Sequence, residues 1–195
     1  MKKKPSLPRG GHHEFRIIAG QWRGRKFSFP DAEGLRPSHD RIRETLFNWL
    51  VYEVEGSRCL DLFAGSGALG LEALSRGAVQ VDFVELNPAA CRSLQQHLKV
   101  LKCSNAQVTV TTADALGVIS QLPDAVYDLV FLDPPFRKGW LDKILEHPGF
   151  KASLTADAHV YIERESGVSL PGQWRMVKEK STATLTYGLY QLGGD

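Results

Sequence analysis

The stretch Leu60–Gly70, LDLFAGSGALG, decides the fold class. Its apolar start predicts a buried strand over residues 58–63, and a helix is predicted from Ala68. Between them, Gly65, Gly67 and Gly70 form a G-x-G-x-x-G pattern. Glycines in such a turn permit positive φ and let a ligand approach the backbone, while the helix start offers unpaired N–H groups. The loop therefore predicts a nucleoside-binding site in an α/β fold.

Two acidic residues follow the next two predicted strands. Glu85 lies 20 residues after Gly65, at the end of a strand, where a carboxylate can accept both hydroxyls of a ribose. Asp114 ends the third strand and can accept an adenine amino group. As an isolated residue it suits a helix N-cap equally well. The glycine loop alone does not distinguish a dinucleotide from S-adenosylmethionine.

Three features favour S-adenosylmethionine over a nicotinamide cofactor. Asp61 stands inside the strand, where a dehydrogenase fingerprint typically has an apolar residue. The chain contains no Tyr-x-x-x-Lys, which weakens the short-chain dehydrogenase alternative. The fourth strand ends in Asp133-Pro134-Pro135-Phe136. A nicotinamide-dependent oxidoreductase is therefore the less favoured alternative.

The Asp-Pro-Pro-Phe motif has the chemistry of an amine-binding turn. Prolines hold a turn rigid and leave the carbonyl of Pro134 available, and Phe136 can stack on a flat ring. Asp133 and that carbonyl can each accept one N–H of an exocyclic amine, which directs the nitrogen lone pair at a methyl sulfonium. We expect Asp133, Pro134 and Phe136 to form the catalytic site. A rigid turn with a capping Asp is the alternative.

Strands and helices alternate from residue 57 onward, which predicts a parallel sheet covered on both faces. Further strands are predicted over 81–86, 108–112, 127–132 and 159–163, and helices over 68–76, 89–102, 115–121 and 141–147. Two last strands, 174–179 and 184–191, predict an antiparallel pair. Before residue 57 we expect a hairpin of strands 15–19 and 26–29, and a helix that begins near Pro37-Ser38.

Basic residues are concentrated at the N-terminus. Residues 1–43 contain 11 Lys and Arg against four Asp and Glu, whereas the remainder contains 13 against 18. A basic arm on an acidic body predicts a polyanionic partner, and aromatic residues among the arginines are typical of nucleic-acid surfaces. The residues that we expect to contact RNA are Arg23, Arg25, Lys26, Arg36 and Arg43.

Composition excludes several classes of protein. The chain of 195 residues is 43% hydrophobic and has no apolar run long enough for a membrane helix. Residues 5–16 supply no apolar core for an export signal. Cys59, Cys91 and Cys103 lack metal-ligand spacing, so we expect no metal, reduced thiols and a cytoplasmic location.

Together, these motifs resemble the class I S-adenosylmethionine-dependent amino-methyltransferases. Residues 16–26 (RIIAGQWRGRK) and 35–50 (LRPSHDRIRETLFNWL) closely resemble the RsmD family of bacterial 16S rRNA guanine-N2 methyltransferases. The resemblance runs from about Arg16 to Gln191. It implies a Rossmann-like, seven-stranded, mostly parallel sheet with helices on both faces, plus an N-terminal hairpin and helix.

The resemblance also implies roles and boundaries. It places S-adenosyl-L-methionine on Asp61, Gly65, Gly67, Gly70, Glu85 and Asp114, with Ser38 near its methionine end. Arg36 or Arg43 would lie near the cofactor carboxylate or an rRNA phosphate. We expect a disordered basic tail over 1–13, the hairpin and helix extension over 14–52 and the methyltransferase domain over 53–195.

The expected substrate is a guanine of 16S rRNA in the small ribosomal subunit, with ribosomal proteins as possible neighbours and a monomeric enzyme. Two alternatives stay open. Methylation of another base amine, such as adenine N6 in RNA or DNA, uses the same motif. A non-catalytic RNA-binding protein with this fold is the alternative from another class.

Overall fold

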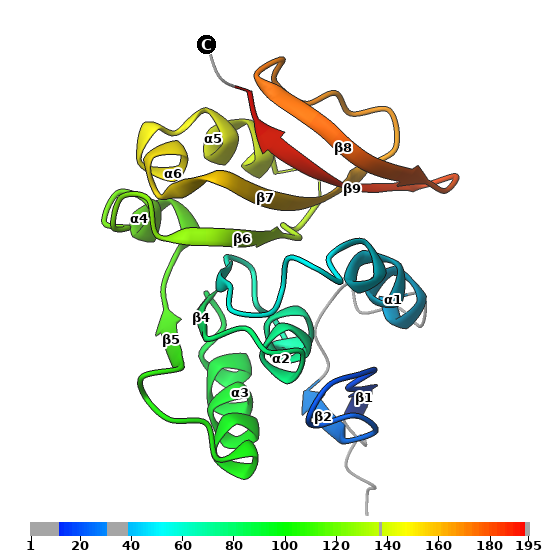
Figure 1. Cartoon of the computed structure of the whole chain (residues 1–195), viewed down its shortest axis with the longest axis vertical. Coiled ribbons are helices and arrows are strands. Elements are labelled where there is room, and N and C mark those ends of the chain that lie inside the picture. The colour runs from blue at the N-terminus through cyan, green and yellow to red at the C-terminus, as the bar shows by residue number, and fades with distance from the viewer. Residues whose placement is uncertain (1–11, 31–38, 137, 194–195) are drawn as a thin grey trace, which may run out of the picture.

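A seven-stranded sheet forms the centre of the molecule (Figure 1). The computed structural model describes residues 12–30, 39–136 and 138–193. The sheet contains β3 (Arg58–Asp61), β4 (Gln80–Glu85), β5 (Val108–Thr112), β6 (Tyr127–Leu132), β7 (Leu154–Glu165), β8 (Trp174–Ser181) and β9 (Leu185–Leu192). Their order is β5-β4-β3-β6-β7-β9-β8.

The first five of these strands are parallel, whereas β9 is antiparallel to both β7 and β8. The mostly parallel sheet with a terminal antiparallel pair is therefore confirmed. The strand order reverses between β3 and β6, because β4 and β5 extend on one side and β7 on the other. In open α/β sheets, ligands bind at the carboxyl ends of the strands beside such a reversal.

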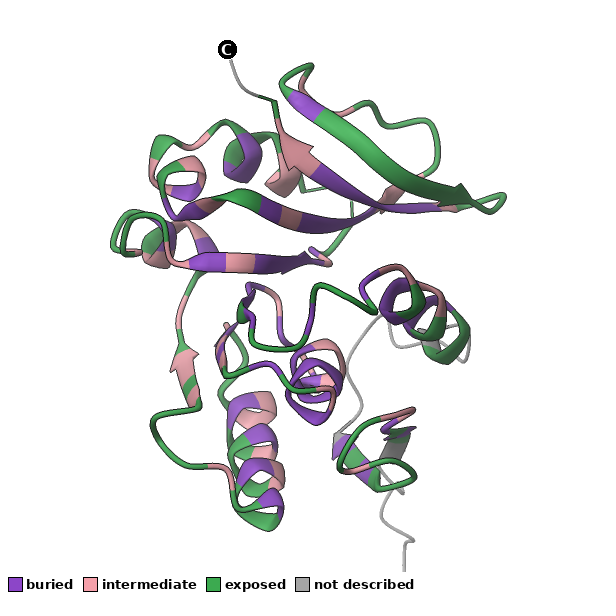
Figure 2. Ribbon diagram, viewed as in Figure 1, coloured by how far each residue is buried: buried purple, intermediate pink, exposed green. Residues whose placement is uncertain are grey.

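Helices cover both faces of the sheet, as expected. One core contains residues of α1 (His39–Trp49), α2 (Ala68–Ser75) and α3 (Pro88–Leu101). The other contains residues of α4 (Ala115–Ile119), α5 (Trp140–Glu146) and α6 (Pro148–Ala152). Figure 2 shows β6 and β9 largely buried between these layers and β8 largely exposed at the sheet edge.

The N-terminal hairpin consists of β1 (His12–Arg16) and β2 (Lys26–Pro30), which pair antiparallel. The hairpin is confirmed, but the expected first strand, 15–19, is wrong in its bounds. The strand begins at His12, inside the tail that we expected to be disordered. It ends at Arg16 because the N–H groups of Ile18 and Ala19 donate to the carboxylate of Glu72 instead of pairing with β2.

Glu72 lies on α2 and is fully buried. Its two oxygens accept the N–H groups of Ile18 and Ala19 at 2.8 and 3.0 Å, and the Nε of Arg76 at 2.7 Å. Arg43 of α1 approaches the same carboxylate, with its Nε 3.9 Å from Oε2. One buried carboxylate thus connects the hairpin, α1 and α2.

The turn after Ile17 is packed tightly against the C-terminal end of α2. Ser75 accepts the N–H of Gln21 at its carbonyl and the N–H of Trp22 at its hydroxyl. Gly20 has φ +81°, and a Cβ there would lie 1.7 Å from the Ser75 carbonyl oxygen. Only glycine fits this close approach, which explains its place in the motif of residues 16–26.

Most of the other helices and strands differ from their predicted bounds by one or two residues at an end, and two differences are larger. β7 starts at Leu154 rather than at His159, because its polar and partly exposed first half lacks the apolar pattern of a buried strand. α6 was missed because it has only five residues, with Pro148 at its start. The helix expected near Pro37-Ser38 is present from His39, and residues 31–38 lie outside the described part of the chain.

We predict that Glu72→Ala lowers the free energy of unfolding by about 3–5 kcal/mol, because it leaves buried donors and a buried arginine without their acceptor. Urea unfolding measures this change. Glu44→Ala on the exposed side of α1 is the control, with an expected change of less than about 0.5 kcal/mol. Similar losses for the two variants would show that the Glu72 contacts contribute little.

Candidate active site at the carboxyl edge of the sheet

The glycine loop joins β3 to α2 and is held from both sides by carboxylates. Asp61, the last residue of β3, accepts the N–H of Gly70 at 3.1 Å. Glu85, the last residue of β4, accepts the N–H of Gly65 at 2.8 Å and that of Asn87 at 2.7 Å. The contacts bring together Asp61, Gly65, Gly70 and Glu85, which lie up to 24 residues apart in the sequence.

The three glycines of the loop serve different purposes. A Cβ at Gly67 would lie 2.4 Å from Leu94 of α3, and one at Gly70 would lie 2.2 Å from Phe83 of β4. These two glycines allow α2 to pack closely against its neighbours. Around Gly65, which has φ +52°, the nearest atom to a Cβ would be 4.0 Å away. The space beside Gly65 leaves room for a ligand to reach the backbone.

Asp114 ends the loop after β5 and caps α4. Its Oδ1 accepts the N–H groups of Leu116 and Gly117, at 3.0 and 3.4 Å. The N-cap interpretation that we gave as an alternative is therefore realised. Asp114 remains exposed, and the next residue back, Ala113, donates its N–H to the carbonyl of Glu85. The two acidic positions thus follow neighbouring strand ends, and a ligand role for Asp114 stays a proposal.

The Asp-Pro-Pro-Phe turn follows β6, directly beside β3 in the sheet. Asp133 is half-buried, Pro134 is buried, and Phe136 is 44% exposed. An aromatic ring that is exposed at a strand end can stack on a flat ligand. Asp61 is the register partner of Phe131, two residues before Asp133, which places the turn next to the glycine loop.

Asp61 is 2% exposed, and its ionisation is disfavoured there. The pKa of Asp61 is raised to about 7, mainly by burial and also by the charges of Asp133 and Glu85, whereas the hydrogen bond from Gly70 opposes the shift. Three carboxyl groups that we assigned from the sequence therefore lie close enough to affect one another at the carboxyl edge.

Sequence reasoning missed a fourth carboxyl group, Glu163 of β7. The register of β6 and β7 pairs Leu132 with Ile162, so Glu163 is the neighbour of Asp133. Glu163 is 4% exposed and accepts the hydroxyl of Tyr161 at 2.6 Å. The alternation of Tyr161 and Glu163 on one strand was visible in the sequence, but only the sheet register places them beside Asp133.

The basic residues assigned to RNA divide into three groups. Arg23, Arg25 and Lys26 are exposed on the hairpin, where they are accessible to a polyanion. Arg36 lies outside the described residues, as does Ser38. The prediction for Arg43 is wrong, because its side chain is buried beside Glu72 and donates to Asp40 and to the carbonyl of Arg16. Burial removes its guanidinium from reach of a phosphate.

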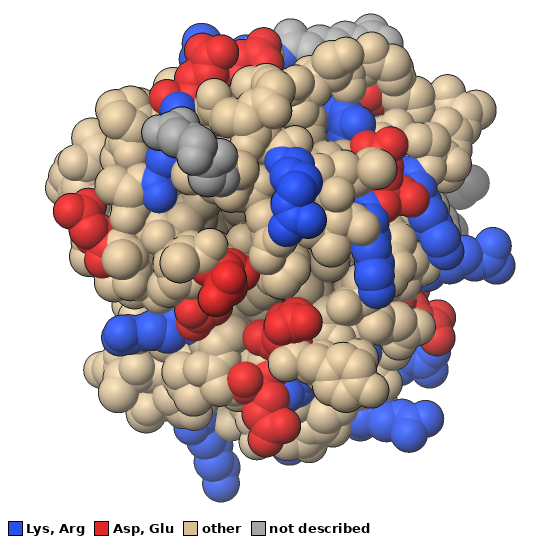
Figure 3. Space-filling model, turned by 45° about the horizontal axis from the view of Figure 1, so that its top comes forward, with Lys and Arg blue, Asp and Glu red and all other residues tan. Residues whose placement is uncertain are grey.

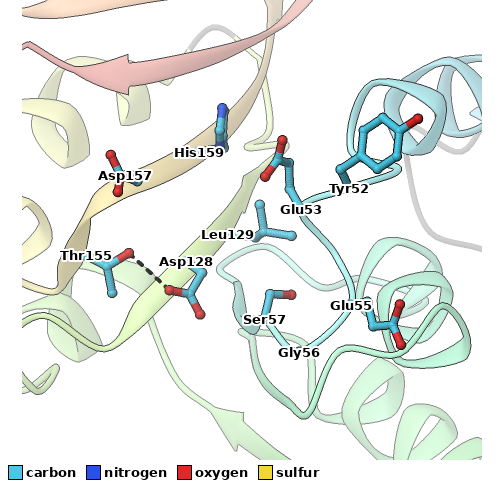
Figure 4. Close-up of a pocket in the computed structure, with 10 residues that line it drawn as sticks. All are labelled: Tyr52, Glu53, Glu55, Gly56, Ser57, Asp128, Leu129, Thr155, Asp157 and His159. Atoms are coloured by element: carbon cyan, nitrogen blue, oxygen red, sulfur yellow. Dashed lines mark hydrogen bonds between the residues drawn. The ribbon is translucent and has the colours of Figure 1, made fainter.

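A cavity of about 280 Å³ opens at the opposite, amino edge of the sheet (Figure 4). Residues at the starts of β6 and β7 line it, and Thr155 donates a hydrogen bond to Asp128 there. Four acidic residues, Glu53, Glu55, Asp128 and Asp157, are among those that line this cavity. Their charge would repel a phosphate backbone, so the cavity does not suit RNA.

The surface charge is mixed on the face drawn in Figure 3, where acidic side chains gather near the middle and basic ones lie mostly around them. In the part of the chain that the structure describes, no helix is long and apolar enough to cross a membrane. No group of three or more His, Cys, Asp or Glu suited to a metal ion occurs among those residues either.

Comparison with known proteins decides the family. The family model described as conserved hypothetical protein 95 matches residues 15–191. The ribosomal RNA small subunit methyltransferase D of Escherichia coli K12 is 44% identical over 195 residues, covering 97% of this chain and 94% of the relative. The chain belongs to the RsmD family of methyltransferases. The relative of the same name in Haemophilus influenzae is also 44% identical, over 91% of this chain and 94% of its own length.

Solved structures agree with this membership. The yhhF protein of Escherichia coli superimposes with a TM-score of 0.81 and 40% identity, over 94% of this chain and all of that one. The 16S rRNA N2 G1207 methyltransferase RsmC of Thermus thermophilus has a TM-score of 0.65 at 23% identity, over 99% of this chain and 53% of that one. The RsmD-family chain therefore has the class I methyltransferase fold, as expected.

We predict that Asp61→Asn stabilises the cofactor-free protein at pH 8 but not at pH 4. The pKa of Asp61 is about 7 in the folded protein, which is higher than in the unfolded chain. The neutral side chain therefore makes its full contribution to stability below about pH 4, and this contribution is lost as the pH rises through 7. Asparagine stays neutral and still accepts the Gly70 N–H.

The gain at pH 8 is at most about 4 kcal/mol, because three pKa units correspond to that free energy. Urea unfolding at both pH values measures it. Asp124→Asn, at an exposed position, is the control and should show no such pH dependence. An equal effect of Asp61→Asn at both pH values would contradict the raised pKa.

Proposed function

We propose that this chain methylates the exocyclic N2 amine of a guanine in 16S rRNA of the small ribosomal subunit, with S-adenosyl-L-methionine as the donor. The observation that carries the proposal is the Asp133–Phe136 turn at the end of β6, beside the glycine loop at the strand-order reversal. The names of the 44%-identical relatives support a small-subunit rRNA substrate.

The residues at the carboxyl edge suit this cofactor. Glu85 already accepts two backbone N–H groups, but each carboxylate oxygen has two lone pairs, so its oxygens can still accept ribose hydroxyls. The space beside Gly65 admits the ligand, and Asp114 is exposed at the neighbouring strand end. Bound S-adenosyl-L-methionine supplies a methyl group on a cationic sulfonium, which the surrounding carboxylates favour.

The target base is held by the turn after β6. Phe136 stacks on a guanine that has been turned out of its helix. Asp133 and the Pro134 carbonyl accept the two N–H bonds of the amine, so its lone pair is directed at the methyl group. After transfer, the nitrogen releases one proton to Asp133 or to water. Arg23, Arg25 and Lys26 of the hairpin bind RNA phosphates with little regard to sequence.

Methyl transfer from radiolabelled S-adenosylmethionine tests the proposal directly. The acceptors are small subunits from cells that lack this protein, with naked 16S rRNA and duplex DNA in parallel, and the product is digested to nucleosides. Label in N2-methylguanosine on the subunits is the expected result. Label in a methyladenine would mean that the target base is adenine rather than guanine. Absence of label with the cofactor still bound would favour a non-catalytic RNA-binding protein.

We predict that Asp133→Ala lowers kcat by about 100- to 1,000-fold, because it removes one of the two groups that orient the amine. The dissociation constant for S-adenosylmethionine should change by less than about threefold, since the glycine loop is intact. Single-turnover transfer and isothermal titration measure the two quantities. Normal turnover of the variant would exclude this role for Asp133.

We predict that Glu85→Ala weakens S-adenosylmethionine binding by about 10- to 100-fold, because a charged hydrogen-bond acceptor is lost. Isothermal titration measures the dissociation constant. Glu55→Ala, at the opposite edge of the sheet, is the control and should bind normally. An unchanged constant for Glu85→Ala would remove this residue from the cofactor site.

A further inference from the structure

Two acidic residues lie at the same level, at the carboxyl ends of two neighbouring parallel strands. β6 and β7 pair through Val130–Val160, Phe131–Tyr161 and Leu132–Ile162, where the ladder ends, and Asp133 and Glu163 are the residues that directly follow this last pair. Residues two apart on a strand share a face, so Glu163 lies on the same face as Tyr161. The carboxyl groups of Asp133 and Glu163 lie close enough to interact electrostatically at the carboxyl edge, where we place the target amine.

Glu163 is enclosed, whereas Asp133 is accessible. Only 4% of Glu163 and 1% of Tyr161 is exposed, and Asp133 is half-buried. The Tyr161 hydroxyl donates to Oε1 of Glu163 at 2.6 Å. The remaining oxygen, Oε2, is the one left for a second contact.

Among the described residues, the titratable and aromatic groups near Glu163 come from several elements. Asp133 lies beside it on the β6 side, and Tyr187 of β9 is its register partner on the other side. Asp61 of β3 interacts with Asp133. The ring of Trp49 of α1 stacks on Tyr187. The ammonium group of Lys180 of β8 lies 6.0 Å from the centre of the Trp49 ring.

A buried carboxyl group next to a half-buried one does not ionise readily while its neighbour is charged. Burial raises the pKa of Glu163, and the charge of Asp133 raises it further, whereas the hydrogen bond from Tyr161 opposes the shift. Glu163 is the more enclosed of the two, so it is the one that favours keeping a proton. Because Tyr161 donates to Oε1, that proton resides on Oε2.

We propose that Glu163 is a positioning residue whose neutral carboxyl donates a hydrogen bond from Oε2 to Asp133 and so orients the Asp133 carboxylate toward the target amine. The inference rests on the proposed function and assigns a new residue to the same site. Glu163 contacts neither the base nor the cofactor in this scheme. It acts through Asp133, which keeps its negative charge because Glu163 carries the proton.

The pair of variants Glu163→Gln and Glu163→Leu separates this role from simple packing. Glutamine can accept from Tyr161 with its carbonyl and donate to Asp133 with its amide, whereas leucine can do neither. We expect Glu163→Gln to keep kcat within about threefold of wild type and Glu163→Leu to lose about 10- to 100-fold, the usual cost of one hydrogen bond to a charged group.

The pH profile supplies a readout that packing alone would not change. Ionisation of Glu163 removes the donor and adds a second negative charge, so wild-type kcat should fall as the pH rises through the raised pKa of Glu163. This fall should be absent in Glu163→Gln. In Tyr161→Phe it should move to higher pH, because the hydroxyl that favours the ionised form is gone.

Single-turnover methylation of small subunits between pH 6 and 9 measures these profiles, with cofactor affinity and melting temperature recorded for each variant. Asp157→Asn, exposed on the same strand at the opposite edge, is the control and should match wild type. A wild-type rate for Glu163→Leu would overturn the inference. A fall in kcat at alkaline pH that is retained in Glu163→Gln would also overturn the inference. This second result does not depend on whether Glu163→Leu folds.

Asp133→Asn, measured in the same series, separates failure of the inference from failure of the proposed function. An inactive Asp133→Asn with a normal Glu163→Leu would reject only the positioning role. An Asp133→Asn that turns over normally would reject the catalytic site itself, and the role of Glu163 with it.

Discussion

The buried carboxylate of Glu72 is the contact on which the arrangement of the N-terminal segments depends. It accepts N–H groups from the chain that leaves β1 and lies in ion-pair distance of Arg43 and Arg76. A charge in the protein interior is tolerated only when such donors surround it. The hairpin and α1 therefore fold as part of the methyltransferase core, with which they share one hydrophobic cluster, rather than as an appended arm.

The carboxyl edge of the sheet shows the reverse arrangement, in which acidic groups are close to one another. Burial raises the pKa values of both Asp61 and Glu163, and Asp133 contributes to each shift. Such mutual repulsion lowers the stability of the protein without ligand. A cationic ligand near Asp61 and Asp133 would reduce the repulsion, so the same charges that weaken the fold would favour binding of a sulfonium.

The motifs of the sequence predicted the fold, because strand–helix alternation and the glycine loop depend on local patterns. The strands β5 and β6 were predicted with their observed bounds. Errors arose where a distant residue decides the outcome. Arg43 belongs to a run of basic residues that predicts an exposed surface, yet its side chain is buried in ion-pair distance of the buried Glu72. Glu163 gives no signal of its own, because its position beside Asp133 depends on how β7 pairs with β6.

The short helix α2 has the glycine loop at one end and the docked turn of Gly20 and Trp22 at the other. The eight helical residues of α2 span about 12 Å. The helix acts as a spacer of fixed length between the basic hairpin and the methyl-donor loop. Under the proposed function, RNA bound by the hairpin would lie about one helix length from the methyl donor, so this separation would help to select the nucleotide that is methylated.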